Sequence, residues 1–129
     1  MIRLSPGQKP PFDKGFYQLH LTLPHSTSMA IGALGAHTLP AGHYIYTGSA
    51  RRGLHARLSR HQRHSKTLRW HIDYLLLSAQ ITAIDVFEIR ETDECTLARQ
   101  SLLLPGSEVI VRGFGSSDCG CPAHLVLVR

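Results

Sequence analysis

The sequence predicts an α+β fold: a small, mostly antiparallel mixed sheet flanked by about three helices. Its 129 residues are enough for one compact domain and too few for two. The 43% hydrophobic and 18% charged residues are typical of a globular core. Segments with the period of a strand lie toward both ends of the chain, and segments with the period of a helix lie between them. We therefore expect helices inserted between the strands of a single sheet.

Residues 1–14 contain Pro10-Pro11 and are expected to form an irregular arm, followed by a single domain over 15–129. Residues 15–23 alternate apolar and polar side chains, as in a half-buried strand. Residues 34–42 are rich in glycine and proline and are expected to be a loop. The segments predicted as strands are 15–23, 29–32, 42–48, 81–90, 108–112 and 124–129, the last two flanking a loop over 113–121.

In the middle of the chain, the spacing of apolar residues predicts helices. Over 54–64, Leu54, Leu58 and His61 share one face. Over 67–79, apolar residues repeat at three and four, which predicts a helix with one buried face. Thr92 is the expected N-cap of a third helix that ends at Pro105-Gly106.

The charges are distributed unevenly along the sequence. No Asp or Glu occurs from Lys14 to Ile72, and eight of the nine acidic residues lie at or after Asp73. The acid-free stretch contains Lys14, Arg51, Arg52, Arg57, Arg60, Arg63, Lys66 and Arg69. Solvated helix faces usually mix the two signs, so this pattern favours a polyanionic partner, in particular nucleic acid.

The sequence has no run of about eighteen apolar residues and no apolar signal-peptide core after Met1. We therefore expect a cytoplasmic protein that does not bind a membrane. Its three cysteines are an odd number, which argues against a disulfide framework. Reduced thiols, small buried residues and metal ligands remain open for Cys95, Cys119 and Cys121.

A group of reactive side chains surrounds the end of the strand at 42–48. Tyr46 lies on that strand, and the following helix carries Arg57 and His61, four residues apart and thus on one side. Arginine can stabilise the charge of a phosphodiester transition state, and tyrosine or histidine can take a proton from water. The most suitable carboxylate for a divalent metal is Glu94, at the start of another helix.

Three short motifs in this order resemble the GIY-YIG nuclease superfamily. Gly15-Phe16-Tyr17 is similar to its first motif, Tyr46-Thr47-Gly48 to its second, and Arg57-Leu58-Ser59-Arg60-His61 to its helix. A more specific resemblance is to an uncharacterised branch that occurs alone in bacteria and fused to endonuclease III-type DNA glycosylases. The segments that carry it are Tyr46–Ala50, Arg69–Leu76, Glu94–Ala98 and Gly113–Cys119.

The resemblance implies a metal-dependent endonuclease, a phosphodiester hydrolase acting on DNA in repair, with Mg²⁺ or Mn²⁺ as cofactor. The catalytic residues it implies are Tyr17 and Tyr46 at the attacking water, Arg57 at the phosphate, His61 one turn later, and Glu94 at the metal. We expect nucleic-acid contacts from Ser49, Arg51, Arg52, Arg60, Arg63, Arg69 and His71.

Three departures from the superfamily pattern are present. Residues 24–42 lengthen the distance between the two tyrosine motifs, and Ser49 stands where a lysine is common. Alignment of the third helix with excision-repair incision subunits places their metal-binding glutamate at Arg99, one turn from Glu94. If Glu94 does not face the site, Asp73 or Asp118 is the next candidate.

A second cluster lies near the end of the sequence, where Cys119, Cys121 and His124 could bind zinc. A fourth ligand would come from Cys95, His71 or Asp118. Alternatively, these cysteines are small buried residues, or the loop binds phosphate through Ser116, Ser117 and the N–H groups of 113–115.

Two other functions remain open beside the nuclease: a catalytically inactive nucleic-acid-binding module and a zinc-stabilised interaction domain. Trp70 could stack on a base, although packing is the commoner role of such a residue. The sequence does not distinguish DNA from RNA, the strandedness or sequence of the substrate, the metal, or the oligomeric state.

Overall fold

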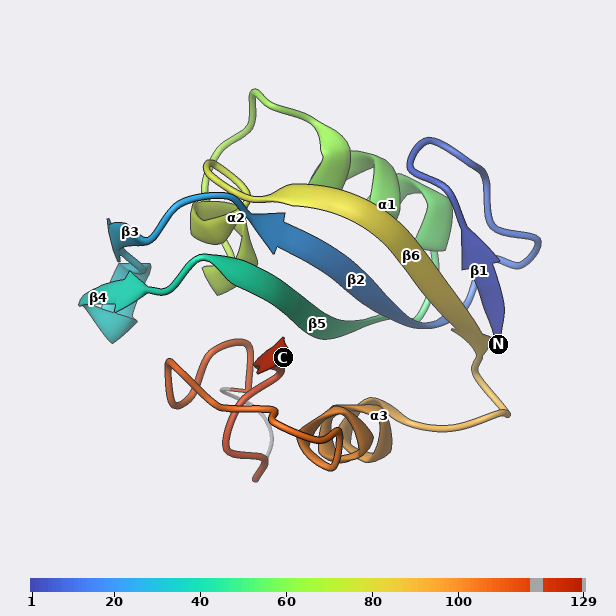
Figure 1. Cartoon of the computed structure of the whole chain (residues 1–129). Coiled ribbons are helices and arrows are strands. Elements are labelled where there is room, and N and C mark those ends of the chain that lie inside the picture. Colours follow the sequence, from blue (N-terminus) through green and yellow to red (C-terminus); the bar gives the residue numbers. More distant parts are fainter. Residues whose placement is uncertain (117–119, 129) are drawn as a thin grey trace.

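The computed structural model describes residues 1–116 and 120–128. Its main sheet has five strands in the order β1-β6-β2-β5-β7, and every pairing between them is antiparallel. These strands are β1 (Ile2–Leu4), β2 (Gly15–Leu23), β5 (Gly42–Ala50), β6 (Gln80–Glu88) and β7 (Leu125–Val128). The predicted α+β class is confirmed (Figure 1).

Three helices accompany the sheet: α1 (Leu54–Gln62), α2 (His71–Leu75) and α3 (Glu94–Leu102). The helix predicted over 67–79 is thus much shorter than expected. The third helix is capped by Asp93, whose side chain accepts from the Thr96 N–H, and not by Thr92. None of the helices among the described residues has the length and apolarity needed to cross a bilayer.

A small second sheet lies in the segment between the two tyrosine motifs. It pairs β3 (Thr27–Ala30) with β4 (Ala36–Leu39), joined by the short 3-10 helix η1 (Gly32–Leu34). The prediction of a loop over 34–42 was therefore wrong for residues 36–39, and the strand predicted at 29–32 begins two residues earlier. In Figure 1 this hairpin extends beyond the main sheet at one end of β2 and β5.

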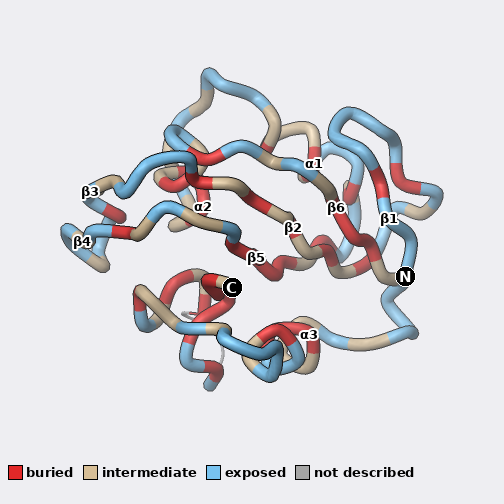
Figure 2. The backbone as a smooth tube through the Cα atoms, in the orientation of Figure 1, coloured by how far each residue is buried: buried red, intermediate tan, exposed pale blue. Residues whose placement is uncertain are grey.

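The odd-numbered residues of β2 are buried and the even-numbered ones half-buried, which gives the main sheet two unlike faces. On the odd face, Tyr17 and Leu19 join a core cluster with Leu58 of α1 and Ile72 of α2. On the even face, the Gln18 side chain donates to the Leu97 carbonyl of α3. Helices α1 and α2 therefore pack on one face and α3 on the other, and buried residues run along β2, β5 and β6 between them (Figure 2).

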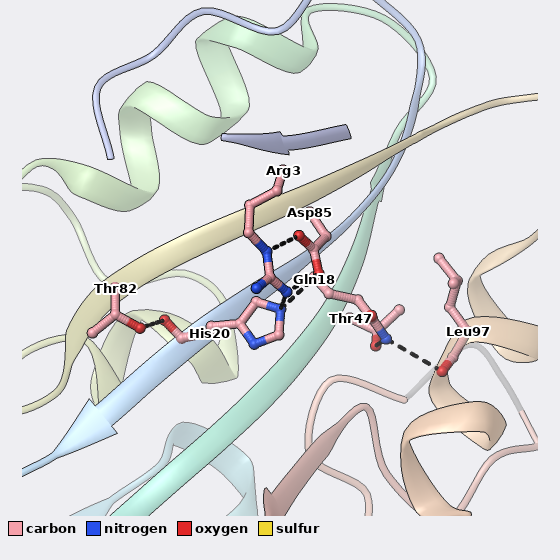
Figure 3. A network of polar contacts seen from close by, with 7 residues as sticks. All are labelled: Arg3, Gln18, His20, Thr47, Thr82, Asp85 and Leu97. Carbon is pink, nitrogen blue, oxygen red and sulfur yellow. Dashed lines mark hydrogen bonds and ion pairs between the residues drawn. The ribbon is translucent and has the colours of Figure 1, made fainter. Parts of the chain in front are cut away.

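A network of polar side chains ties the N-terminal edge strand β1 to β6 and β2 (Figure 3). Arg3 donates to both carboxylate oxygens of Asp85, at 2.8 and 2.9 Å, and His20 Nε2 lies 2.8 Å from the same carboxylate. Leu4 is buried in the core, and β1 pairs with β6. The prediction that residues 1–14 form an irregular arm was therefore wrong for residues 2–4.

Among residues 1–116 and 120–128, the segment predicted as a strand at 108–112 forms no strand, and its pairing there is a single bridge between Glu108 and Leu127. Strand β7 pairs with β5 only along 43–46. Beyond Tyr46, among the described residues, no strand covers the outer edge of β5, where the Thr47 N–H donates to the His124 carbonyl. Side chains from both faces of the sheet can meet around this open edge.

Candidate functional site

The interior part of the site is a hydrogen-bonded pair between β2 and α1. The Tyr17 hydroxyl lies 2.7 Å from His61 Nε2, and both side chains are buried. Tyr17 is only 1% exposed. Its ring lies over Gly48 on the neighbouring strand, where an added Cβ would be 2.5 Å from Tyr17 Cζ. The glycine of the second motif therefore makes room for the tyrosine of the first.

Arg57 connects this pair to the end of β5. One of its guanidinium nitrogens donates to the Ser49 carbonyl at 2.9 Å, and the guanidinium lies close enough to the Tyr17 hydroxyl to oppose the rise that burial causes in the pKa of that phenol. The guanidinium carbon lies 4.5 Å from the centre of the Trp70 ring, in a cation–π contact. Three contacts thus fix the direction of a cation that remains half-buried.

Glu94 reaches the same place from α3, on the other face of the sheet. Ser49 and His124 lie beside its carboxylate and help to lower its pKa, and His124 Nδ1 lies 2.7 Å from its Oε2. The Glu94 side chain is 28% exposed, whereas His124 is 2% exposed. The contacts therefore form one connected series: His61, Tyr17, Arg57, Ser49, Glu94 and His124.

Tyr46 lies beside this series. It is 8% exposed, and its ring meets His61 and Phe114 edge-on, with centroids 6.3 and 6.1 Å apart. Gly115 packs on the ring: a Cβ there would lie 2.9 Å from Tyr46 Cε1. Within the described part of the chain, the Tyr46 hydroxyl has no hydrogen-bond partner. Of the two tyrosines, Tyr46 is therefore the more accessible to a bound water.

Burial sets the charge states of the site. It raises the pKa of both Tyr17 and Tyr46, so both are neutral phenols at physiological pH. Burial, together with the charge of Lys66, lowers the pKa of His61 to about 3, so its imidazole is neutral as well. Burial alone would raise the pKa of Glu94, but His124, Ser49 and Arg57 outweigh it and lower that pKa. The Arg57 cation and the Glu94 anion therefore lie beside three neutral side chains, Tyr17, Tyr46 and His61.

The structure brings together all five predicted catalytic residues: Tyr17, Tyr46, Arg57, His61 and Glu94. The residues predicted to contact nucleic acid differ in burial and in their partners. Arg51, Arg52, Arg63 and Arg69 are exposed and lie on the surface as expected. Ser49 lies inside the site, between Arg57 and Glu94.

Arg60 and His71 have structural partners. Arg60 is 15% exposed and forms a bidentate ion pair with Asp73, which is 0% exposed. Burial raises the pKa of Asp73, but Arg60 and two backbone N–H groups lower it to about 2. His71 Nδ1 accepts from the Gly115 N–H at 2.8 Å. Asp73 is therefore not available as a metal ligand, and His71 holds the loop that packs on Tyr46.

The loop over 113–116 is not an open phosphate cradle. The four N–H groups of these residues donate to carbonyls of Pro122, Val111 and Gly113 and to His71. The expected use of the 113–115 N–H groups for phosphate is therefore wrong. Ser117, expected to help in that binding, lies outside the described residues.

A second cluster of ligand-type atoms lies next to Glu94. The side chains of Cys95, Cys121 and His124 place one ligand atom each within 4.8 Å of one another, so this cluster could hold a metal ion. His124 Nε2 is buried and has no hydrogen-bond partner among the described residues. Cys95, one of the candidates for a fourth ligand, joins two of the residues predicted for zinc. Cys95 is however disulfide-bonded, so its sulfur could bind a metal only after reduction, and the expectation that the odd number of cysteines argues against disulfides is wrong for this residue. Cys119 and Asp118 lie outside the part of the chain that the structure describes.

Sequence reasoning missed three structural roles in the site. Gly48 and Gly115 are the spacers under the two tyrosine rings, and His124 is a partner of the glutamate. The role of Gly48 could have been predicted from the sequence, because this glycine directly follows Tyr46-Thr47 in the second motif. The His124 contact had none, because it joins residues 30 positions apart in segments that no periodicity relates.

The fold and the geometry of the site define the class of protein. It is a small antiparallel α+β domain whose site contains tyrosine, arginine and glutamate side chains. The sequence model of a family described as a domain of unknown function, DUF123, matches residues 16–129. Because this match spans nearly the whole chain, the protein belongs to that family. No curated protein and no solved structure matches significantly.

Proposed function

We propose that this protein is a metal-dependent endonuclease of the GIY-YIG type that hydrolyses phosphodiester bonds of nucleic acid. The observation that supports this most strongly is the series of contacts that links Tyr17, Arg57 and Glu94 through Ser49. These residues come from β2, α1 and α3. Apolar side chains would pack these elements equally well, so folding alone does not explain why a tyrosine, an arginine and a glutamate lie together here. Their chemistry suits a phosphate.

Arg57 is the group that binds and stabilises the phosphate. Its guanidinium is held by the Ser49 carbonyl, the Tyr17 hydroxyl and the Trp70 ring, so little reorganisation is needed when negative charge develops. A planar guanidinium also suits two oxygens of one phosphate. Tyr17 acts from the interior, by orienting Arg57.

Tyr46 is the tyrosine that contacts the attacking water, because its hydroxyl has no other partner among the described residues. Its raised pKa means that it enters the reaction as a neutral phenol. It therefore orients the water through a hydrogen bond, and proton removal needs a second acceptor such as a phosphate oxygen or Glu94.

Glu94 is the residue that would hold a divalent cation. Mg²⁺ is commonly bound through one or two carboxylates together with waters and substrate phosphates. A single, partly exposed and ionised carboxylate fits that donor set. The ion would polarise the phosphate and stabilise the leaving oxygen.

The substrate we propose is DNA, and the process is repair, as the fusion of similar proteins to DNA glycosylases implies. Arg51 and Arg52 follow β5 directly and are exposed next to the site, where they can contact phosphates along the strand. Arg63 and Arg69 extend this basic surface near α1.

Cleavage of labelled single-stranded, duplex and abasic DNA with Mg²⁺ or Mn²⁺ tests the proposal. We expect Arg57→Ala and Glu94→Gln each to reduce the rate by about 100-fold or more, because each removes a group that acts in the transition state. The matched controls are Arg112→Ala, which removes an exposed arginine outside the proposed DNA-binding surface, and Glu88→Gln, which neutralises an exposed glutamate. DNA binding without cleavage of any substrate would instead identify a catalytically inactive binding module.

A second candidate function, supported by the placement of Cys95, Cys121 and His124, is an interaction domain that binds zinc once the disulfide of Cys95 is reduced. Cysteine and histidine are the usual ligands of structural zinc. Elemental analysis of the protein purified under reducing conditions tests this. About one zinc per chain, lost in His124→Ala, would support it, and a metal-free folded protein would exclude it.

A further inference from the structure

A cleft of about 490 Å³ opens beside the candidate site on the even face of the sheet. It lies between the start of β2, the end of β5, the segment after β6 and the start of α3. Its apolar walls include Phe16, Ala50 and Ile89, and its polar rim includes Ser49, Arg51 and Glu94.

The cleft and the candidate site share two residues. Ser49 and Glu94 line the cleft, and the same two residues link Arg57 to His124: Arg57 donates to the backbone carbonyl of Ser49, and His124 contacts the Glu94 carboxylate. Any group that enters the cleft therefore lies next to the carboxylate. Ile89 is 43% exposed, so its side chain is accessible to a group that enters the cleft.

The composition of the walls indicates what the cleft can hold. A phosphate is a poor occupant, because the walls are mainly apolar and Glu94 adds a negative charge. The apolar, planar part of a nucleic acid is its base, which stacks on aromatic rings such as Phe16 and can donate N–H groups to a carboxylate. Arg51, on the rim, can at the same time contact the phosphate that follows the base.

We propose that this cleft binds an unpaired nucleobase next to the cleaved bond, so that the preferred substrate contains a bulged, mismatched or single-stranded nucleotide. The inference depends on the proposed function for the position of the cleaved phosphate. A base inside a regular duplex is paired and stacked, and removing it costs free energy that an unpaired base does not require. The cleft thereby favours distorted DNA over a regular duplex.

Phe16 offers a sharp test, because the sequence contains a matched control. Phe87 is its direct cross-strand partner, is also half-buried, and does not line the cleft. We would compare Phe16→Leu with Phe87→Leu on a duplex carrying one unpaired 2-aminopurine and on the same duplex with that base paired. Both the fluorescence of 2-aminopurine on binding and the rate of cleavage are measured.

In the native protein we expect quenched fluorescence of the unpaired base and faster cleavage of the bulged duplex. Phe16→Leu should reduce the ratio of bulged to regular cleavage about tenfold, the effect of losing one stacking contact, and should relieve the quenching. Phe87→Leu should change neither. Equal quenching in both variants, or equal cleavage of bulged and regular duplex by the native protein, would overturn the inference.

The two measurements separate this inference from the proposed function. If no DNA is cleaved but the unpaired base is quenched in a Phe16-dependent way, the nuclease proposal fails and the base-binding cleft stands. If cleavage depends on Arg57 and Glu94 while quenching is absent, the cleft proposal fails and the nuclease proposal stands.

Discussion

At the scale of single residues, Gly48 determines whether the Tyr17 ring can occupy its place. Gly48→Ala would put a methyl group 2.5 Å from Tyr17 Cζ, in a buried strand with little freedom to move. Overpacking of this kind typically costs about 1–3 kcal/mol. We expect a loss of that size in the free energy of unfolding, measured by urea denaturation, together with a displaced Tyr17–His61 pair.

Gly120→Ala is the control for this substitution, because a Cβ at Gly120 meets no atom of the described residues within 4 Å. It should change the free energy of unfolding by less than about 0.5 kcal/mol. Equal stability of the two variants would mean that the strand can shift to accept the methyl group, and that Gly48 does not set the position of Tyr17.

His124 is expected to position Glu94 for the metal. Its Nδ1 lies 2.7 Å from Glu94 Oε2 and its ring is buried, so it restricts the carboxylate to one orientation. Loss of such a partner typically weakens metal affinity by about 10- to 100-fold. We expect His124→Gln to raise the Mg²⁺ or Mn²⁺ concentration needed for half-maximal cleavage by that factor, while the rate at saturating metal falls less.

The exposed His64 supplies the control: His64→Gln should leave the metal dependence unchanged. A His124 variant with native metal dependence would show that Ser49 alone orients the glutamate. Loss of all activity at every metal concentration, in a folded variant, would assign His124 a different role.

Sequence reasoning at this scale succeeded where a motif carried the residue and failed where a distant partner decided its role. Tyr17, Tyr46, Arg57 and Glu94 were identified and do lie together. Arg60 was expected at the nucleic acid because it is a charged residue on a basic helix. Its ion pair joins α1 to α2 across 13 residues, and no spacing rule connects it to Asp73.

At the scale of elements, Asp73 is the residue that ties α1 to α2. It accepts from Arg60 and from the N–H groups of Arg69 and Trp70, and it is completely buried. Asp73→Ala removes the carboxylate partner of the largely buried Arg60, which keeps only its contacts to the Thr67 carbonyl and the Trp70 ring, and leaves these two N–H groups without their acceptor. Breaking a buried ion pair in this way typically costs about 3–5 kcal/mol. We expect a loss of that size in urea denaturation.

Asp93→Ala is the corresponding control, because it removes an exposed aspartate that caps only its own helix. Its expected cost is about 1 kcal/mol. If the two variants lose equal stability, the buried Arg60–Asp73 pair is not a main support of the α1–α2 connection.

The errors in the predicted elements have the same origin as those at single residues. Asp73 holds the N–H groups of Arg69 and Trp70, so the chain before α2 does not continue as a helix despite the apolar spacing of residues 67–79. Strand β1 has only three residues, and its partner β6 lies about 80 positions away. Long, regular segments such as β2 and α1 were predictable because their own periodicity is enough to define them.

At the scale of the whole molecule, buried His61 makes stability depend on pH. Burial lowers its pKa to about 3 in the folded protein, whereas an unfolded histidine titrates near 6.5. Between pH 3 and pH 6.5, the unfolded chain therefore binds one more proton at this histidine than the folded chain does. Stability is therefore fully present above pH 6.5 and falls toward pH 3, by up to about 1.4 kcal/mol per pH unit from this group.

We expect His61→Gln to flatten the stability profile between pH 6.5 and 4, measured by urea denaturation at each pH. His64→Gln, at an exposed position, should keep the native slope. The pKa of Asp73 is lowered to about 2, so its stabilising effect is lost only below about pH 4, outside this window. A slope in His61→Gln equal to that of the native protein would contradict the prediction.

The contact between Glu94 and His124 also has a consequence for protein synthesis. The side chains of the site come from residue 17 at one extreme to residue 124 at the other. A chain emerging from the ribosome has both tyrosines and the arginine long before it has the histidine that orients the glutamate. If this protein cuts DNA, its site stays incomplete during translation until the segment that carries His124 and β7 has been synthesised and has folded against β5.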